Sequence, residues 1–99
     1  TRGIELDPTS ADGYINRGNI RRDMRKYEIA LEDYAAALVI NPEDPVPYLN
    51  RSSLYRVLNR LKEANSDIDR VIFLSPGSIN GYINRGIILR DRGMLEEAL

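Results

Sequence analysis

The chain has 99 residues, of which 29% are charged, and its 14 lysines and arginines nearly cancel its 15 aspartates and glutamates. The net charge of −1 gives no electrostatic reason to expect nucleic acid or an anionic membrane as the main partner. No apolar run is long enough to cross a bilayer, and the lack of cysteine and histidine excludes disulfides, the usual zinc ligands and thiol or imidazole catalysis. Phosphate-binding glycine loops and calcium-loop carboxylate spacings are absent as well. We therefore expect no enzymatic activity, no metal site and no cofactor.

One short sequence recurs along the chain at intervals of 34 residues. YINRG occupies positions 14–18 and again 82–86, and YLNRS stands between them at 48–52. Prolines and alanines keep the same interval, at Pro8, Pro42, Pro76, Ala30, Ala64 and Ala98. Self-similarity at a fixed period of this length is typical of proteins built by stacking one supersecondary unit.

Each unit is predicted to begin with a helix. The residue two places after each proline is a good N-cap for the free amides of a first helical turn, at Ser10, Asp44 and Ser78. Pro45 suits the first helical position, where no amide hydrogen is needed. We expect these first helices over residues 11–24, 45–58 and 79–92. They should end near Arg25, Asn59 and Gly93, of which Arg25 suits a left-handed conformation least.

A second helix is predicted in each unit, over residues 28–40 and 62–74, because apolar residues recur there at spacings of three and four. Small residues on the first helices, at Gly18, Ser52 and Gly86, should let the second helices approach closely. Residues 5–8 are interpreted as the end of a preceding unit. Leu95 to Leu99 should be the first residues of a further second helix.

This 34-residue pattern of aromatic, small and proline residues resembles that of the tetratricopeptide repeat (TPR) family. The matching positions in the three units are Tyr14, Gly18, Ala30, Tyr34, Ala37 and Pro42; Tyr48, Ser52, Tyr55, Ala64, Ile68, Val71 and Pro76; and Tyr82, Gly86, Leu89 and Ala98. Departures are Arg21, where the family prefers tyrosine, and Ser52, where it prefers glycine. The resemblance implies an all-α right-handed solenoid, with the end of one repeat at 1–10, complete repeats at 11–44 and 45–78, and a truncated repeat at 79–99. It also implies a scaffold that binds a peptide segment of a partner in the concave groove formed by the first helices.

Arginine stands in each unit where this family more often has leucine, at Arg17, Arg51 and Arg85. Sixteen residues after the first two come Asp33 and Asp67, so we expect the pairs Arg17–Asp33 and Arg51–Asp67, with each arginine stem packed between the helices. The partner of Arg85 would fall at position 101. Ligand binding is the alternative role for these arginines. The tyrosines three residues earlier are interpreted as helix-packing residues.

Asparagine also recurs in register, at Asn16, Asn50 and Asn84, although it is a mediocre residue for a helix interior. By the resemblance this position faces into the groove, where an amide can hold the backbone of an extended peptide without reading its sequence. O-linked N-acetylglucosamine transferase is similar in having such an asparagine ladder. The alternative is a solvated or locally bonded asparagine. The remaining candidate peptide-binding residues are Asn19, Ser53, Arg22, Arg56 and Arg90, whose arginines either meet acidic side chains of a ligand or form an ordinary solvated stripe.

One specialised TPR site, the clamp for the C-terminal carboxylate of cytosolic chaperones, is not expected here. That clamp uses lysine and asparagine, then asparagine, then lysine and arginine on three successive first helices. The corresponding positions hold only uncharged residues: Ile15 and Asn19 on the first helix, Asn50 on the second, and Asn80 and Asn84 on the third. The asparagines match, but every cation is missing.

Two other functions remain open from the sequence: a self-assembling structural scaffold, and the substrate-recruiting arm of a larger enzyme. A cytoplasmic location is favoured. Several apolar residues of the last first helix are expected to lack the helix that should cover them, namely Tyr82, Ile83, Ile87, Ile88 and Leu89. We therefore expect self-association through residues 79–99 at micromolar to millimolar concentration.

Overall fold

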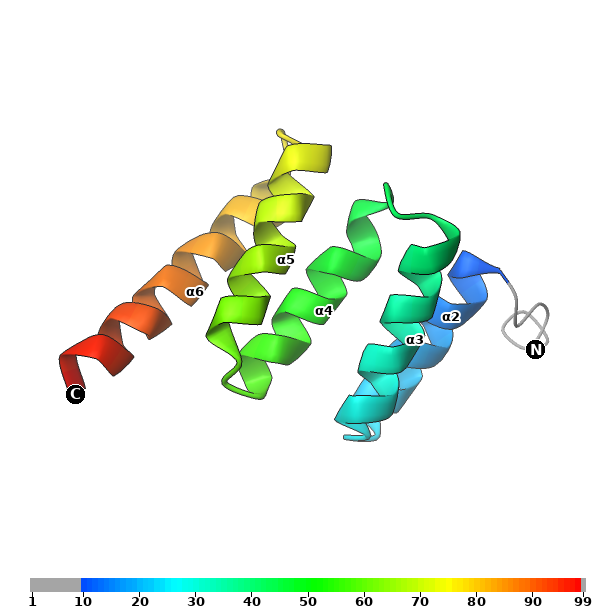
Figure 1. Cartoon of the computed structure of the whole chain (residues 1–99), viewed down its shortest axis with the longest axis horizontal. Helices are drawn as coiled ribbons and strands as arrows, with labels where there is room; N and C mark the ends of the chain where they lie inside the picture. Colours follow the sequence, from blue (N-terminus) through cyan, green and yellow to red (C-terminus); the bar gives the residue numbers. More distant parts are fainter. Residues whose placement is uncertain (1–9, 99) are drawn as a thin grey trace.

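Helices form all the regular structure in the part of the chain that is described. The computed structural model describes residues 10–98, with side chains up to residue 93 (Figure 1). Its helices are α2 (Ala11–Asp23), α3 (Tyr27–Ile40), α4 (Pro45–Val57), α5 (Leu61–Leu74) and α6 (Ile79–Ala98). This confirms the predicted all-α array of helix-turn-helix units. The predicted end of a preceding unit, at residues 5–8, lies outside the described residues.

The helix starts follow the predicted caps. The amide nitrogens of Gly13, Val46 and Gly81 donate to Ser10 Oγ, Asp44 Oδ1 and Ser78 Oγ, each at 3.0 Å. Pro45 is the first residue of α4, as predicted. Each cap satisfies one of the amides that a helix start leaves without a partner, so the local sequence determines where α2, α4 and α6 begin.

The turn after α2 is closed by a residue in the left-handed conformation, and so is the turn after α4. Arg25 has a φ of 64° and Asn59 a φ of 61°. The Lys26 amide donates to the Arg21 carbonyl at 2.8 Å, and the Arg25 amide to the Arg22 carbonyl at 2.9 Å, which is the double hydrogen bond of a Schellman turn. A left-handed arginine costs about 1–2 kcal/mol, and the packing of α3 on α2 must offset that cost.

The predicted end of the last helix near Gly93 is wrong. Helix α6 continues to Ala98, and Gly93 has no positive φ. The expected second helix from Leu95 onward is therefore absent from residues 95–98. Residues 94–98 (MLEEA) are mostly strong helix formers, which favour continuation of α6 over a turn. Continuing α6 adds one hydrogen bond per residue at no nucleation cost.

The helices form two layers, of which one is more closely packed. Helix α4 touches both α2 and α6, whereas α3 and α5 make no contact with each other within the described residues. Helices α3 and α5 form the other layer: α3 packs on α2 and α4, and α5 packs on α4 and α6 (Figure 1). An array whose first helices touch while its second helices diverge curves toward the first helices. The layer of α2, α4 and α6 therefore forms the concave side.

Two apolar clusters form the core between the layers. The first consists of Ala30, Leu31, Tyr34 and Leu54, and the second of Ala64, Ile68, Val71 and Ile88. Ile88 is only 1% exposed, so the expectation that it would be uncovered is wrong, because it faces α5. The expected exposure of the other side of α6 is confirmed for Tyr82, Ile83 and Leu89, which are 45–54% exposed, while Ile87 is half-buried.

Candidate functional site

A buried carboxylate joins the two helices of the second unit. Arg51 Nε and Nη2 donate to Asp67 Oδ2 and Oδ1 at 2.7 and 2.8 Å, and Asp67 is 5% exposed. The guanidinium also lies over the rings of Tyr48 and Tyr55. Burial raises the pKa of Asp67, and the hydrogen bonds from Arg51 offset that effect only in part. The same hydrogen bonds raise the pKa of Arg51 and keep it charged.

The first unit contains the equivalent pair, with an additional cation. Asp33 is 3% exposed and accepts from Arg17 Nη2 at 2.9 Å and from Arg21 Nη1 at 3.2 Å. Both predicted Arg–Asp pairs therefore form in the structure. The contribution of Arg21 was not predicted, although its place one helical turn after Arg17 was a signal that both face the same carboxylate. These arginines are engaged between the layers, which favours their structural role over ligand binding.

Two candidate groove residues bind each other rather than facing solvent freely. Asn19 Oδ1 accepts from Tyr34 Oη at 2.5 Å and from Asn50 Nδ2 at 3.3 Å. This network joins α2, α3 and α4, and so links the first unit to the second. Sequence reasoning missed it. The only sequence signal for this network was the repeated polar stripe. That stripe does not show which residues meet, because Asn19 and Asn50 are 31 residues apart and come together only through packing between units.

The other asparagines of the ladder are less engaged. Asn16 is exposed and Asn84 is half-buried, and neither has a hydrogen bond from its side chain within the described residues. Asn50 keeps its second amide hydrogen and its Oδ1 available beside Asn19. Thus the three members of the ladder are not equivalent: the middle one is partly structural, and the outer two have no hydrogen-bond partner among the described residues.

One arginine from each helix of the inner layer completes the candidate set. The guanidinium of Arg22 lies 3.6 Å from Asp23, and that of Arg90 lies 3.7 Å from Asp91. These separations exceed hydrogen-bond distance, and such exposed pairs contribute little to stability. Arg56 is half-buried and has no acidic partner among the described residues. Ser53 is half-buried on the same helix. None of these three arginines is therefore held by a close carboxylate among the described residues.

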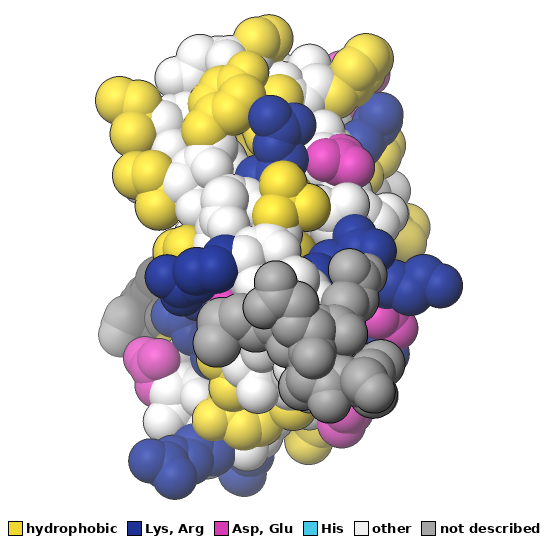
Figure 2. Space-filling view, turned by 90° about the vertical axis from the view of Figure 1, so that its left-hand side faces the viewer, with side chains coloured by type: hydrophobic (Ala, Val, Ile, Leu, Met, Phe, Trp, Pro, Cys, Tyr) yellow, Lys and Arg dark blue, Asp and Glu magenta, His cyan; other side chains and the backbone are white. Residues whose placement is uncertain are grey.

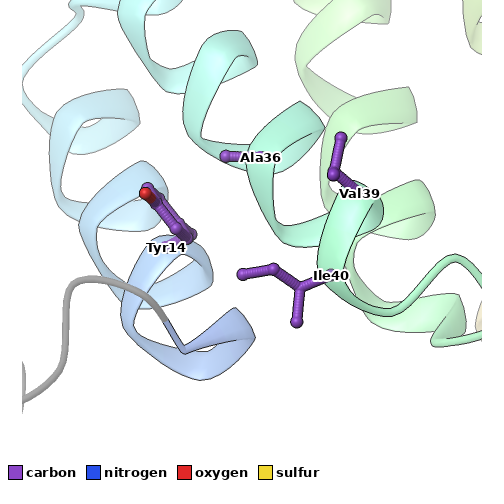
Figure 3. Close-up of a pocket in the computed structure, with 4 residues that line it drawn as sticks. All are labelled: Tyr14, Ala36, Val39 and Ile40. Atoms are coloured by element: carbon purple, nitrogen blue, oxygen red, sulfur yellow. The ribbon is translucent and has the colours of Figure 1, made fainter.

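A separate hollow lies outside this groove. It has a volume of about 350 Å³ and is lined by Tyr14, Ala36, Val39 and Ile40, from α2 and the end of α3 (Figure 3). The lining side chains include no charged group, and none belongs to the predicted binding set. Among residues 10–98, no helix is both long and apolar enough to cross a membrane.

A family model and a curated relative each match part of the chain. Residues 11–44 match the family model described as tetratricopeptide repeat. The chain is 44% identical over 41 residues to the Hsp70-Hsp90 organizing protein of Triticum aestivum, and the match covers 41% of this chain and 7% of that protein. The chain thus spans a small fraction of the curated relative that it matches.

Solved structures share the fold over nearly the whole chain. The first TPR domain of human RPAP3 aligns with a TM-score of 0.87 at 23% identity, covering 99% of this chain and 77% of that domain. The second TPR domain of human RPAP3, solved in complex with the HSP70 peptide SGPTIEEVD, aligns with a TM-score of 0.78 at 28% identity, covering 88% and 72%.

Proposed function

We propose that this chain, which belongs to the tetratricopeptide repeat family, is a protein-interaction scaffold that binds an acidic, extended peptide segment of a partner in the groove of α2, α4 and α6. The observation that supports this most is that α4 contacts both α2 and α6, because helices in one such layer can present their polar side chains along a shared concave surface. We take residues 11–44 and 45–78 as the two complete repeats, and we assign no catalytic role to any residue.

The asparagines would hold the backbone of the peptide. Within the described residues, the side-chain amides of Asn16 and Asn84 make no hydrogen bond, so both amide hydrogens and the carbonyl oxygen of each could serve a ligand. Asn50 would contribute its remaining hydrogen and its Oδ1, since its other hydrogen is held by Asn19. A side-chain amide can donate to a peptide carbonyl and accept from a peptide amide at once, so it favours an extended chain whose own groups are unpaired.

The arginines would select acidic side chains. Arg22, Arg56 and Arg90 each offer a planar guanidinium that can bind a carboxylate through two parallel hydrogen bonds. Their present acidic neighbours are 3.6 Å away or more, so a ligand carboxylate displaces no strong pair. The peptide bound by the second TPR domain of RPAP3 contains two adjacent glutamates, which makes it a suitable probe.

A free C-terminal carboxylate should matter little for binding here. Ile15 is 7% exposed and belongs to the core, and Asn80 and Asn84 are uncharged. No cation therefore stands at the positions where the chaperone clamp holds the terminal carboxylate. Recognition by this chain should depend on acidic side chains within the peptide instead.

Calorimetric titration with three peptides tests this proposal: SGPTIEEVD, its C-terminal amide, and SGPTIQQVD. We expect the acid and the amide to bind within about twofold of each other. The glutamine peptide should bind about fivefold more weakly, which is a loss of ~1 kcal/mol in binding free energy. Arg56→Gln should weaken binding of SGPTIEEVD, whereas Lys62→Gln, an exposed change on α5, should not. Loss of binding on amidation, or no binding of any peptide at ~1 mM, would contradict the proposal.

A further inference from the structure

A fully buried tyrosine hydroxyl lies next to the two asparagines that join the first unit to the second. Tyr34 is 0% exposed, and its ring packs so closely on α2 that a Cβ placed on Gly18 would lie 2.9 Å from Tyr34 Cε1. The ring therefore has little freedom to move, and its hydroxyl donates to Asn19 Oδ1 at 2.5 Å. Asn50 Nδ2 donates to the same oxygen at 3.3 Å. One acceptor thus connects α2, α3 and α4.

The Tyr34 hydroxyl determines which way the amide of Asn19 faces. Burial raises the pKa of Tyr34, so the phenol keeps its proton at neutral pH. The hydroxyl makes no other hydrogen bond within the described residues, and a buried donor without an acceptor is strongly unfavourable. Asn19 therefore turns its Oδ1 toward Tyr34, which leaves its two N–H groups on the side away from that hydroxyl.

The shared oxygen also orients Asn50. Because Asn19 Oδ1 is an acceptor, Asn50 turns its Nδ2 toward it, and the Oδ1 of Asn50 then faces the opposite way. Neither Asn19 Nδ2 nor Asn50 Oδ1 has a hydrogen-bond partner among residues 10–98, and both side chains are half-buried rather than enclosed. The two amides therefore present donors from Asn19 beside an acceptor from Asn50.

Within the described residues, the second unit has no equivalent of this arrangement. The residue 34 positions after Tyr34 is Ile68, which is 0% exposed and has no hydroxyl. Ser53 and Asn84 stand at the positions equivalent to the two asparagines, and the side chain of Asn84 makes no hydrogen bond there. Figure 2 shows the α6 end of the molecule, where hydrophobic and basic side chains lie side by side on the surface. The oriented amides are thus a property of the junction between α2, α3 and α4.

We propose that Tyr34 is a positioning residue of the peptide groove: its buried hydroxyl turns Asn19 to donate to a backbone carbonyl of the bound peptide, and turns Asn50 to accept from a backbone amide. This role rests on the peptide-binding function proposed above. One residue of an extended chain directs its N–H and C=O to the same side, so the two amides can hold a single residue of the peptide. Because both amides are oriented before the peptide binds, ordering them adds little to the entropic cost of binding.

Tyr34→Phe removes the hydroxyl and keeps the packed ring. Tyr27→Phe on the same helix is the matched control, because the Tyr27 hydroxyl makes no hydrogen bond among the described residues. Calorimetric titration of the full chain with SGPTIEEVD should show about fivefold weaker binding for Tyr34→Phe and unchanged binding for Tyr27→Phe. In the ligand-free chain labelled with ¹⁵N, Tyr34→Phe should shift the side-chain NH₂ signals of Asn19 and Asn50 and leave that of Asn84 in place.

A double-mutant cycle distinguishes orientation of the amides from a general loss of stability. If Tyr34 acts through Asn19, Tyr34→Phe should weaken binding no further in a chain that already carries Asn19→Ala. An undiminished effect of Tyr34→Phe in that chain would overturn the inference. Equal affinity of the original chain and Tyr34→Phe would also overturn it, and would leave the proposed function standing. No binding of SGPTIEEVD by the original chain at ~1 mM would instead overturn the proposed function, and the inference with it.

Discussion

Removal of the Asp67 carboxylate should destabilise the protein far more than removal of a neighbouring surface carboxylate. Asp67→Ala leaves the Arg51 guanidinium with its side chain 20% exposed and without either of its two short hydrogen bonds. Breaking a buried ion pair costs about 3–5 kcal/mol. Arg51 keeps some water contact and the faces of Tyr48 and Tyr55, so we expect a loss of about 2–3 kcal/mol in the free energy of unfolding. For a chain of this size that lowers Tm by roughly 10–20 °C.

Thermal and denaturant unfolding followed by circular dichroism measure this loss, with Asp69→Ala as the control. Asp69 is on the same helix, is exposed and has no partner among the described residues, so its removal should change stability by less than about 0.5 kcal/mol. Asp33→Ala should cost less than Asp67→Ala, because Arg17 and Arg21 are 43% and 31% exposed and remain hydrated. Equal effects of Asp67→Ala and Asp69→Ala would refute the reasoning.

A double substitution distinguishes the effect of an unpaired buried charge from the effect of lost side-chain volume. Replacing both partners, with Arg51→Met and Asp67→Leu together, removes the unpaired guanidinium and restores apolar contact. Such replacements of buried pairs are often neutral or stabilising. The double variant should therefore recover about 1 kcal/mol or more relative to Asp67→Ala. A double variant as unstable as Asp67→Ala would show that packing, rather than the uncompensated charge, accounts for the loss.

Three further predictions follow from single contacts. Gly18→Ala should destabilise the protein by about 1–2 kcal/mol, because its Cβ meets the buried Tyr34 ring. Gly86→Ala should stabilise it by about 0.5–1 kcal/mol through helix propensity. A higher Tm for Gly18→Ala than for Gly86→Ala would contradict the packing described. Because burial raises the pKa of Asp67, the folded protein takes up this proton at a higher pH than the unfolded chain, so its titration should add stability as pH falls toward ~4. Asp67→Asn should remove that part of the pH profile of unfolding, and an unchanged profile would refute the assignment. Asn50→Ala should cost about 1 kcal/mol through its bond to Asn19, while alanine at Asn16 and Asn84 should leave Tm unchanged; equal losses at all three would make the whole ladder structural.

The features that could be predicted from sequence are those determined by local rules. Caps such as Ser10 and Asp44 act on amides within three residues, so their effect does not depend on the rest of the fold. The pair Arg51–Asp67 could be predicted because the 34-residue period keeps both partners in register between two helices that a short turn places side by side. The same argument gave the exposed face of α6 at Tyr82 and Leu89.

The features that were missed depend on packing between units or on competition between two local structures. The bond between Asn19 and Asn50 spans 31 residues and exists only because α2 touches α4. The burial of Ile88 depends in the same way on how α5 lies against α6. At Gly93, a turn and a continuous helix are both compatible with the sequence. The helix formers of residues 94–98 favour the continuous helix, so the outcome was not determined by the glycine alone.

The central claim, that the inner layer binds an acidic extended peptide through its asparagines, is tested most directly by the side-chain amide resonances of ¹⁵N-labelled protein. SGPTIEEVD is titrated in, and the NH₂ signals of Asn16, Asn50 and Asn84 are followed together with those of Asn41 and Asn65, which lie outside the inner layer. The account predicts saturable shifts for the three groove asparagines and none for the other two. Saturable binding that leaves the three groove signals unmoved would contradict it.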